Sequence, residues 1–241
     1  MAKKTKFLDI PVLTGDREDI CESIYEKLAR GEKFHLITLN ALMVNHAFEH
    51  PDFFKILKAG LCVNDSVGIR MASFLLTGCA IANFPGIELF YNLCAFFASR
   101  KSRVFVYGSS EDVNKAACGK LQRRFPGINI CGRLNGYADD AVKIIKNAQP
   151  GFLFAALDSP RQENWLNEHL TELKCAGMGI GGTLDVFSGK LRRANPVFRA
   201  AGLEWLGRLL REPWRAGRIM RLPVFLARII RIYFSRRFPR G

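Results

Sequence analysis

The chain has 241 residues, 49% of them apolar, so it can bury a sizeable core as one large domain or as a domain with an appendage. This composition excludes a disordered basic tail protein. The last fifty residues hold +11 of the formal net charge of +14, because thirteen arginines there meet only two acids, Glu204 and Glu212. Arginine recognises phosphate through a planar fork, so the charge indicates phosphate on a lipid, a nucleotide or a nucleic acid.

The amino-terminal segment does not have the pattern of a signal peptide. Lys3, Lys4 and Lys6 precede only a short apolar run, which Asp9 ends. Seven scattered cysteines form neither a C-x-x-C pair nor a zinc-like cluster with the four histidines. We therefore expect reduced core thiols in a cytosolic protein and no metal site.

Short β-rich runs alternate with amphipathic helical patterns along the first part of the chain. The runs are residues 34–39, 61–63, 104–107, 128–131, 152–157 and 178–180. This alternation predicts an α/β fold in which helices flank a Rossmann-like, mostly parallel sheet. Ligands of such sheets lie beyond the carboxyl ends of the strands. Polar and small residues follow the runs at Asn40, Asn64, Asp65, 108–110, 158–160 and 181–183. We therefore expect one site assembled from several strand ends.

A domain boundary is expected near Pro196, where the charge composition changes. It separates an α/β core over residues 1–195 from an arginine-rich helical appendage over residues 196–241. Pro213 and Pro223 break the appendage into helices, each proline being acceptable in a first turn.

The final helix of the appendage is amphipathic. Its most apolar stretch, residues 222–234, is interrupted by Arg228 and Arg231, so a membrane-spanning helix is not expected. With Ser235, these arginines form one narrow face against aliphatic and aromatic residues, which is the pattern of a helix lying in a membrane interface. The alternative is a solvated arginine face on a helix packed against the core.

Asp65 is the first candidate for chemistry, because a carboxylate at a strand end beside a helix N-terminus can act as a general base or bind a hydroxyl. It is equally suited to cap the helix. For Thr38 and Asn40, a local role, capping in the case of Asn40, is the default, and substrate contact is the alternative. The turn that begins at Gly108 could hold a phosphate on its N–H groups, although the acids that follow favour capping.

A glycine cluster follows the last β-rich run, at Gly179, Gly181, Gly182 and Gly189, together with Thr183 and Asp185. Glycines at a strand end let a ligand approach the backbone, and Thr183 could open a helix whose amides face an anion. Close packing of helix on strand is the alternative. No D-x-D pair occurs in the chain, so a phosphate leaving group would need arginines or backbone amides for neutralisation.

Taken together, ordered motifs resemble the bacterial WecG/TagA/CpsF glycosyltransferases over roughly residues 34–221. The matching segments are Thr38–Asn40, Asn64–Gly68, Asn135–Tyr137, Ser159–Glu163, Gly181–Asp185, Gly189–Lys190, Arg193–Ala194, Gly202–Leu206 and Glu212–Pro213 with Arg215 and Arg218. The resemblance implies a metal-independent, inverting transfer of a sugar from a UDP-sugar to a polyprenyl-diphosphate-linked saccharide. The enzyme would need no cofactor and would work at the cytoplasmic face of the bacterial cell membrane, in exopolysaccharide, surface-antigen or teichoic-acid synthesis.

The resemblance also implies roles for individual residues. Asp65 would take the proton from the acceptor hydroxyl, and Thr38 and Asn40 would line the sugar or acceptor pocket. The nucleotide contacts and cleft lining would come from Tyr137, Gln162, Glu163, Gly181, Gly182, Thr183 and Asp185. The appendage would close the site at an anionic membrane surface, with Arg215, Arg218 and Arg221 near diphosphate.

Three positions depart from the family pattern: Ser66, where Gly is more frequent, Glu88, where Asp is commoner, and Asp158, where a small residue is usual. They bear on the choice of donor more than on the reaction class.

The sequence leaves two other functions open. A nucleic-acid-binding module could use the arginine tail on phosphates, although nucleic acid is not expected because no reading motif appears. A catalytically silent UDP-binding homologue is the second. The apolar face of the tail could also serve a contact between copies of the chain.

Overall fold

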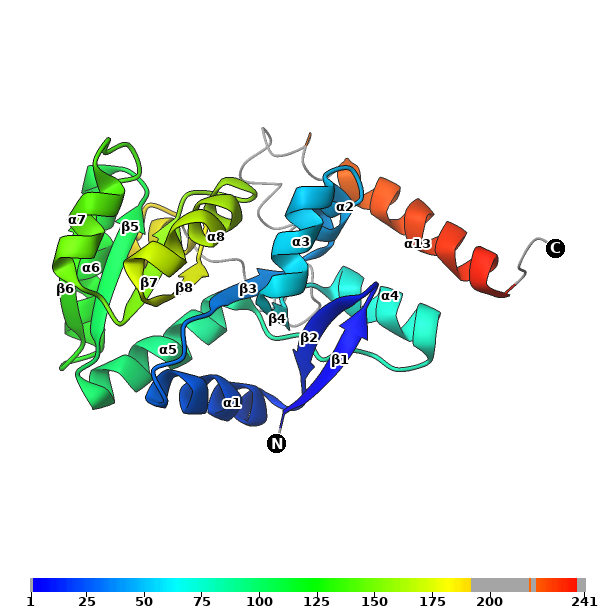
Figure 1. The fold of residues 1–241 in the computed structure, drawn as a ribbon, viewed down its shortest axis with the longest axis horizontal. Helices are drawn as coiled ribbons and strands as arrows, with labels where there is room; N and C mark the ends of the chain where they lie inside the picture. The colour runs from blue at the N-terminus through cyan, green and yellow to red at the C-terminus, as the bar shows by residue number, and fades with distance from the viewer. Residues whose placement is uncertain (1, 192–216, 218–219, 238–241) are drawn as a thin grey trace.

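The computed structural model describes residues 2–191, 217 and 220–237 (Figure 1). In these ranges eight strands form one sheet in the order β1-β2-β4-β3-β8-β7-β5-β6. The strands are β1 Lys3–Phe7, β2 Ile10–Thr14, β3 His35–Leu39, β4 Leu61–Asn64, β5 Arg103–Gly108, β6 Asn129–Leu134, β7 Phe152–Ala156 and β8 Ala176–Gly179. Every pairing is parallel except that of β1 with β2. The predicted α/β fold with a mostly parallel sheet is confirmed.

Helices cover both faces of the sheet (Figure 1). The described helices are α1 Arg17–Ala29, α2 Ala41–Ala47, α3 Pro51–Ala59, α4 Val67–Thr77, α5 Gly86–Arg100, α6 Glu111–Arg124, α7 Ala141–Ala148, α8 Arg161–Leu173, α9 Thr183–Ser188 and α13 Arg221–Arg237. Buried side chains of α1, α5, α6 and α9 form the core on one face. On the other face, α2, α3, α4 and α13 share one apolar cluster and α7 and α8 share another.

Local sequence explains several of these elements. All five residues of β7 are buried, as a parallel strand covered on both faces requires. Helix α1 begins after Asp16, whose carboxylate accepts a hydrogen bond from the N–H of Asp19 at 2.8 Å, the usual role of an N-cap residue. Helix α4 ends at Gly78, which has a left-handed φ of 74°, the conformation that favours glycine at a helix C-terminus.

The β1–β2 hairpin at one edge of the sheet is the element that the sequence patterns did not indicate. In β1 the first residues are lysines and exposed positions predominate. Lysines on an edge strand discourage pairing with a further strand.

Helix α13 packs on the core instead of standing apart from it. Phe225 and Ile229 are buried in the cluster with α2 and α4. Arg228 donates hydrogen bonds from Nη1 to the backbone oxygen and the Oδ1 of Asn45, at 2.9 and 3.0 Å, and from Nη2 to Glu49 Oε1 at 2.6 Å. Arg228 of the predicted arginine face therefore binds the α2 region, where its guanidinium contacts three oxygens.

Two further expectations concern the appendage and the cysteines. The boundary at Pro196 lies outside the described residues. None of the helices in the described ranges is long and apolar enough to cross a membrane. All seven cysteines are free, and the prediction of core thiols is confirmed for the five that are buried, whereas Cys79 is exposed and Cys131 half-buried. Burial raises the pKa of Cys62 to about 12.

Candidate active site

The carboxyl ends of β3 and β4 bring Thr38 and Asp65 together with Gly86, the first residue of α5. Asp65 Oδ1 accepts a hydrogen bond from the N–H of Gly86 at 2.8 Å. A β-carbon at Gly86 would lie 3.1 Å from Thr38 Cγ2 and 3.3 Å from Asp65 Oδ2. Asp65 therefore accepts a hydrogen bond from a first-turn N–H of α5, a contact that the sequence did not indicate.

Asn64, just before Asp65, fixes the approach of the segment that leads to Gly86. Its buried amide nitrogen donates to the backbone oxygens of Ile81 and Ala82, at 3.3 and 3.2 Å, and its Oδ1 accepts from the N–H of Ser66 at 2.8 Å. A fully buried amide needs such partners. The sequence placed Asn64 at the strand end but did not indicate this bracing role.

Asn40 caps α2, as expected. Its Oδ1 accepts hydrogen bonds from the N–H groups of Leu42 and Met43, both at 3.0 Å. The side chain is only partly buried, and its place after β3 puts it beside the Thr38–Asp65 pair along the sheet edge.

A second group of predicted residues lies where β7 and β8 end. Gln162 and Glu163 open α8 and are both buried. Gln162 Oε1 accepts from the N–H of Gly181 at 2.9 Å, and its Nε2 donates to Glu163 Oε1 at 2.7 Å. A β-carbon on Gly179 would lie 2.5 Å from Gln162 Nε2, so close packing explains that glycine. Gln162 thereby joins α8 to the loop after β8.

The loop after β8 runs through Gly181 and Gly182 into α9, which begins at Thr183 as predicted. Thr183 is buried, and Asp185 in the first turn accepts the N–H of Leu191 on its backbone oxygen at 2.9 Å. Gly181 has a left-handed φ of 45°, a conformation that glycine adopts at little cost.

Gly108 lies at the adjoining end of β5, pressed against β7. With a φ of 115°, it would place a β-carbon 2.3 Å from the backbone oxygen of Ala156. Gly136, after β6, also lies close by, since its β-carbon would lie 3.0 Å from Leu157 Cδ2 and 3.3 Å from the Cα of Gly108. The ends of β5, β6 and β7 thus pack closely at these two glycines.

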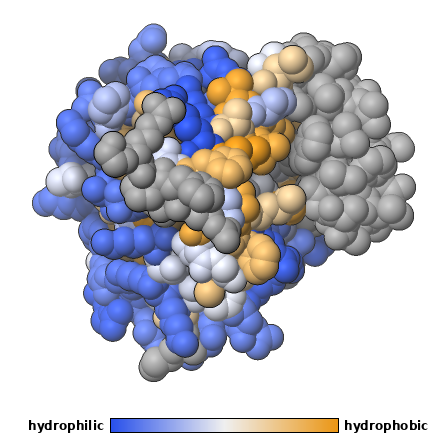
Figure 2. All heavy atoms as spheres, turned by 90° about the vertical axis from the view of Figure 1, so that its right-hand side faces the viewer, coloured by the Kyte–Doolittle hydropathy of each residue, from blue (hydrophilic) through white to orange (hydrophobic). Residues whose placement is uncertain are grey.

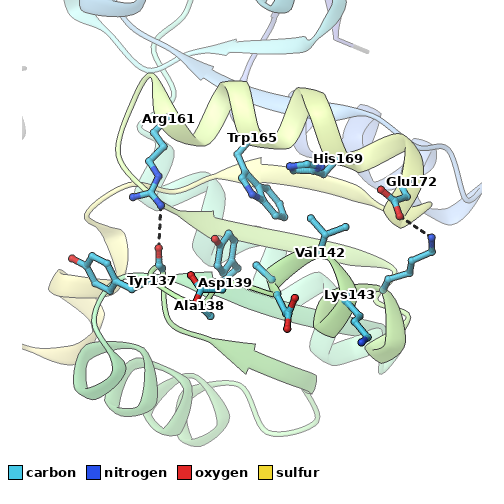
Figure 3. A pocket seen from close by; sticks show the side chains of 14 residues that line it. Tyr137, Ala138, Asp139, Val142, Lys143, Arg161, Trp165, His169 and Glu172 are labelled. Atoms are coloured by element: carbon cyan, nitrogen blue, oxygen red, sulfur yellow. Dashed lines mark hydrogen bonds and ion pairs between the residues drawn. The ribbon is translucent and has the colours of Figure 1, made fainter.

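A cavity of about 660 Å³ opens between α7 and α8, beside this convergence (Figure 3). Trp165 lies inside it, with its ring 4.8 Å from that of Tyr107 and 4.7 Å from that of His169. Arg161 closes one end by donating from Nη2 to the backbone oxygen of Gly136 at 3.1 Å. Burial raises the pKa of Tyr107, against a smaller opposing effect of Arg161.

Tyr137 stands at the rim of this cavity and is 78% exposed. Its side chain points away from Trp165 in Figure 3. The ring is available to a planar ligand near the ends of β5 and β6. Sequence reasoning found Tyr137 but not Trp165 or His169, because their spacing of four is equally typical of a helix packing on a sheet.

Of the three arginines expected near diphosphate, Arg221 is described and Arg215 and Arg218 lie outside the described residues. Arg221 opens α13 and is exposed. It lies near the C-terminal end of α2, where burial, His50 and Arg221 lower the pKa of His46. Asn40 caps the opposite end of α2, so the described chain places Arg221 apart from the Asp65 cluster.

Three positions depart from the family pattern, and the structure gives physical reasons for two of them. Asp158 is exposed and has a left-handed φ of 62°, which explains why a glycine-like residue suits the position and why Asp is tolerated there. Glu88 forms an ion pair with Arg17 of α1. Nothing in the structure explains Ser66.

Among the described residues, no cluster of three or more His, Cys, Asp or Glu side chains could hold a metal ion. The strand-end site combines the carboxylates of Asp65, Glu163 and Asp185 with amide groups, hydroxyls and glycine backbone, and an aromatic cavity lies at one end.

Comparison with known proteins defines the class. The model of the WecG/TagA/CpsF glycosyl transferase family matches residues 5–239, so the chain belongs to this family and is a glycosyltransferase. One relative is the N-acetylglucosaminyldiphosphoundecaprenol N-acetyl-beta-D-mannosaminyltransferase of Bacillus subtilis (strain 168). A protein of the same name from Staphylococcus aureus (strain MW2) is equally similar. Each is 32% identical over 200 residues, which cover 80% of this chain and 78% of the relative.

Proposed function

We propose that this glycosyltransferase transfers a sugar from a UDP-sugar, with inversion and without a metal ion, to a polyprenyl-diphosphate-linked saccharide. The names of the relatives support an acceptor of this kind, since both act on N-acetylglucosaminyldiphosphoundecaprenol. They also favour an N-acetylhexosamine as the sugar transferred. The reaction would serve the synthesis of a cell-envelope glycan at the inner face of the membrane.

The observation that carries the proposal is the carboxylate of Asp65, oriented by the N–H of Gly86 at the joint carboxyl end of β3 and β4. In an inverting transfer, the acceptor hydroxyl attacks the anomeric carbon while the bond to the UDP oxygen breaks. Asp65 would take the proton of that hydroxyl as general base, and Thr38 and Asn40 would contact the sugar or the acceptor.

The donor would lie along the ends of β5, β7 and β8. The nearest atoms to a β-carbon at Gly181 and Gly182 would lie 3.9 and 3.7 Å away, so a ligand can approach the backbone closely there. Tyr137 offers an exposed ring to the uracil, while Gln162 and Glu163 brace the loop from Gly181 to Asp185 that would border the diphosphate.

The leaving UDP gains negative charge as its bond to the sugar breaks. Preorganised positive groups stabilise such charge best where water is excluded. We assign this role to Arg215 and Arg218, because the chain contains no D-x-D pair to hold a metal in their place. Arg221 is not included, because it lies at the end of α2 opposite Asn40.

The test is transfer from UDP-N-acetylmannosamine, UDP-N-acetylglucosamine and UDP-hexoses to a short-chain N-acetylglucosaminyl-diphosphoryl-polyprenol, with and without EDTA. We expect one UDP-N-acetylhexosamine to be used, with turnover unchanged by EDTA and an inverted anomeric centre in the product by NMR. Loss of turnover in EDTA that Mg²⁺ or Mn²⁺ restores would refute the metal-independent reaction.

A binding experiment distinguishes the two alternative functions, a nucleic-acid-binding module and a catalytically silent homologue. Tight, salt-dependent binding to duplex DNA with no affinity for UDP would instead favour a nucleic-acid-binding module. Binding of UDP without any turnover would indicate a catalytically silent homologue.

A further inference from the structure

Helix α4, which begins just after Asp65, presents large apolar side chains to solvent. Met71 is 67% exposed and Phe74 is 62% exposed, and Leu75 is also exposed. Arg70 is the only charged residue in α4. The side of α4 that packs inward is formed by Ile69 and Ala72 in the core cluster. The helix is therefore apolar on both sides, and the part of the chain that the structure describes covers only one of them.

Helix α13 continues this surface. Leu226, Ile230 and Phe234 recur every four residues and are 55%, 41% and 54% exposed, so they form one stripe along the helix. Arg228, which binds the α2 region, lies about half a turn around the helix from Ile230. The stripe therefore faces away from α2.

The two apolar surfaces adjoin. A β-carbon on Gly68 of α4 would lie 3.8 Å from a ring carbon of Phe225 in α13. Met71 and Leu75 follow Gly68 at helical spacings of three and seven, so they lie on the side of α4 toward α13. Both helices extend to the same side of the molecule in Figure 1, and Figure 2 shows hydrophobic residues gathered across that side. We call Met71, Phe74, Leu75, Leu226, Ile230 and Phe234 the apolar face.

On α4 and α13, all charged residues beside the apolar face are positive. Neither α4 nor α13 contains Asp or Glu, whereas Arg70, Arg221 and Arg231 are exposed on them. Exposed apolar groups flanked by arginine suit the boundary between headgroups and acyl chains of an anionic bilayer. A second copy of the chain would bring the same arginines together, and their repulsion opposes self-association through this face.

We propose that α4 is a membrane-docking helix, which inserts Met71, Phe74 and Leu75 beside the α13 stripe into the surface of an anionic bilayer. The inference rests on the proposed lipid-linked acceptor and deepens it. Docking does not depend on the arginine-rich appendage alone, because half of the apolar face belongs to the catalytic core.

This arrangement brings the site near the bilayer surface. Met71 and Phe74 lie six and nine residues after Asp65, which is roughly 9 to 14 Å along a helix rising 1.5 Å per residue. The headgroup layer on each side of a bilayer is roughly 5 to 8 Å thick. Asp65 is therefore within about 14 Å of the backbone of the inserted residues, close enough to the bilayer surface to meet the diphosphate and first sugar of a polyprenyl-linked acceptor.

The first experiment compares binding of the full chain to vesicles of phosphatidylglycerol and phosphatidylcholine by sedimentation. The variant Met71→Gln/Phe74→Gln/Leu75→Gln is expected to bind at least about tenfold more weakly to anionic vesicles. Ile144→Gln is the matched control, because Ile144 is 41% exposed on α7 and lies outside the apolar face. Unchanged binding of the triple variant, or a monomer–dimer equilibrium that it alone abolishes, would overturn the proposal.

A second experiment separates docking from catalysis. On a water-soluble short-chain acceptor the triple variant should turn over like the unaltered enzyme, whereas on a long-chain acceptor in vesicles it should lose about tenfold. An equal loss on both acceptors would overturn the docking role. If neither acceptor is used even by the unaltered enzyme, the proposed function fails, while the vesicle-binding result still decides the docking.

A single substitution covers the case in which the triple variant does not fold. Phe74→Trp retains an apolar side chain, and its fluorescence should be quenched by vesicles with brominated acyl chains more strongly than that of the unaltered protein. No additional quenching would show that α4 stays out of the bilayer.

Discussion

The N–H of Gly86 donates a 2.8 Å hydrogen bond to Asp65 Oδ1, across 21 positions of sequence. The donor is the first N–H of α5, one of the groups that a helix leaves without an internal partner. The carboxylate is thus aimed by main chain, and the bracing by Asn64 keeps that main chain in place. Such backbone support fixes a reacting group more firmly than a mobile side chain would.

Asp65→Asn should abolish most of the activity without unfolding the enzyme. Asparagine keeps an oxygen for the Gly86 N–H but cannot take a proton, so kcat should fall by about 10²- to 10⁴-fold while KM changes little. Transfer kinetics and thermal unfolding would be measured together. Asp52→Asn is the control, since Asp52 is exposed and pairs with Lys55. Wild-type turnover in folded Asp65→Asn would refute the assignment.

Gly86→Ala should misplace the same carboxylate. The added methyl group would lie 3.1 Å from Thr38 Cγ2 and 3.3 Å from Asp65 Oδ2, which is tighter than ordinary van der Waals contact. We expect kcat to fall at least about tenfold, because small displacements of a reacting group are costly.

Thr38→Ser provides the matched test of this crowding, because it removes the Cγ2 methyl group and keeps the hydroxyl. The double variant Gly86→Ala/Thr38→Ser should regain part of the activity that Gly86→Ala loses. If the effects of the two single substitutions on kcat simply add in the double variant, the contact with Thr38 is not the cause of the loss in Gly86→Ala.

Sequence patterns predicted the features that depend on neighbouring residues. Asn40 capping α2 and Thr183 opening α9 follow from residue type and position alone. The contact of Asp65 with Gly86 could not be predicted, because it depends on how the segment after α4 returns to the sheet. The packing of α13 was ambiguous for a related reason. An amphipathic helix has the same periodicity whether it lies on lipid or on core, and the burial of Phe225 and Ile229 is decided by α2 and α4.

Gly108→Ala should destabilise the fold strongly. The β-carbon would overlap the backbone oxygen of Ala156 at 2.3 Å, in addition to the strain of a φ of 115°. We expect a loss of at least about 3 kcal/mol in the free energy of unfolding, measured with urea. Gly31→Ala isolates the strain, because Gly31 has a φ of 70° and open space around it, and should cost only about 1 kcal/mol. Equal losses would show that the contact with β7 is unimportant.

Arg228→Ala should loosen α13 from the core. It removes three hydrogen bonds to Asn45 and Glu49 and the packing over the Phe48 ring, 5.4 Å away. We expect a loss of about 1 to 3 kcal/mol in urea unfolding. Arg228→Lys should recover little, since lysine lacks the fork that reaches all three oxygens. The exposed Arg231→Ala on the same helix is the control, and an equal loss there would contradict a specific anchor at Arg228.

His35 should make the fold less stable in mild acid. Both ring nitrogens are buried without a hydrogen-bond partner among the described residues, and burial lowers the pKa of His35 to about 4. The unfolded chain, with a pKa near 6.5, binds more protons between these values, so stability is complete above about pH 6.5 and falls toward pH 4. The full loss in the free energy of unfolding, from above pH 6.5 to below pH 4, is about 3 kcal/mol. Urea unfolding at pH 7 and pH 5 should show the difference, and His35→Leu should reduce it, whereas His169→Gln should leave it unchanged. A pH dependence that persists in His35→Leu would assign the acid sensitivity to another group.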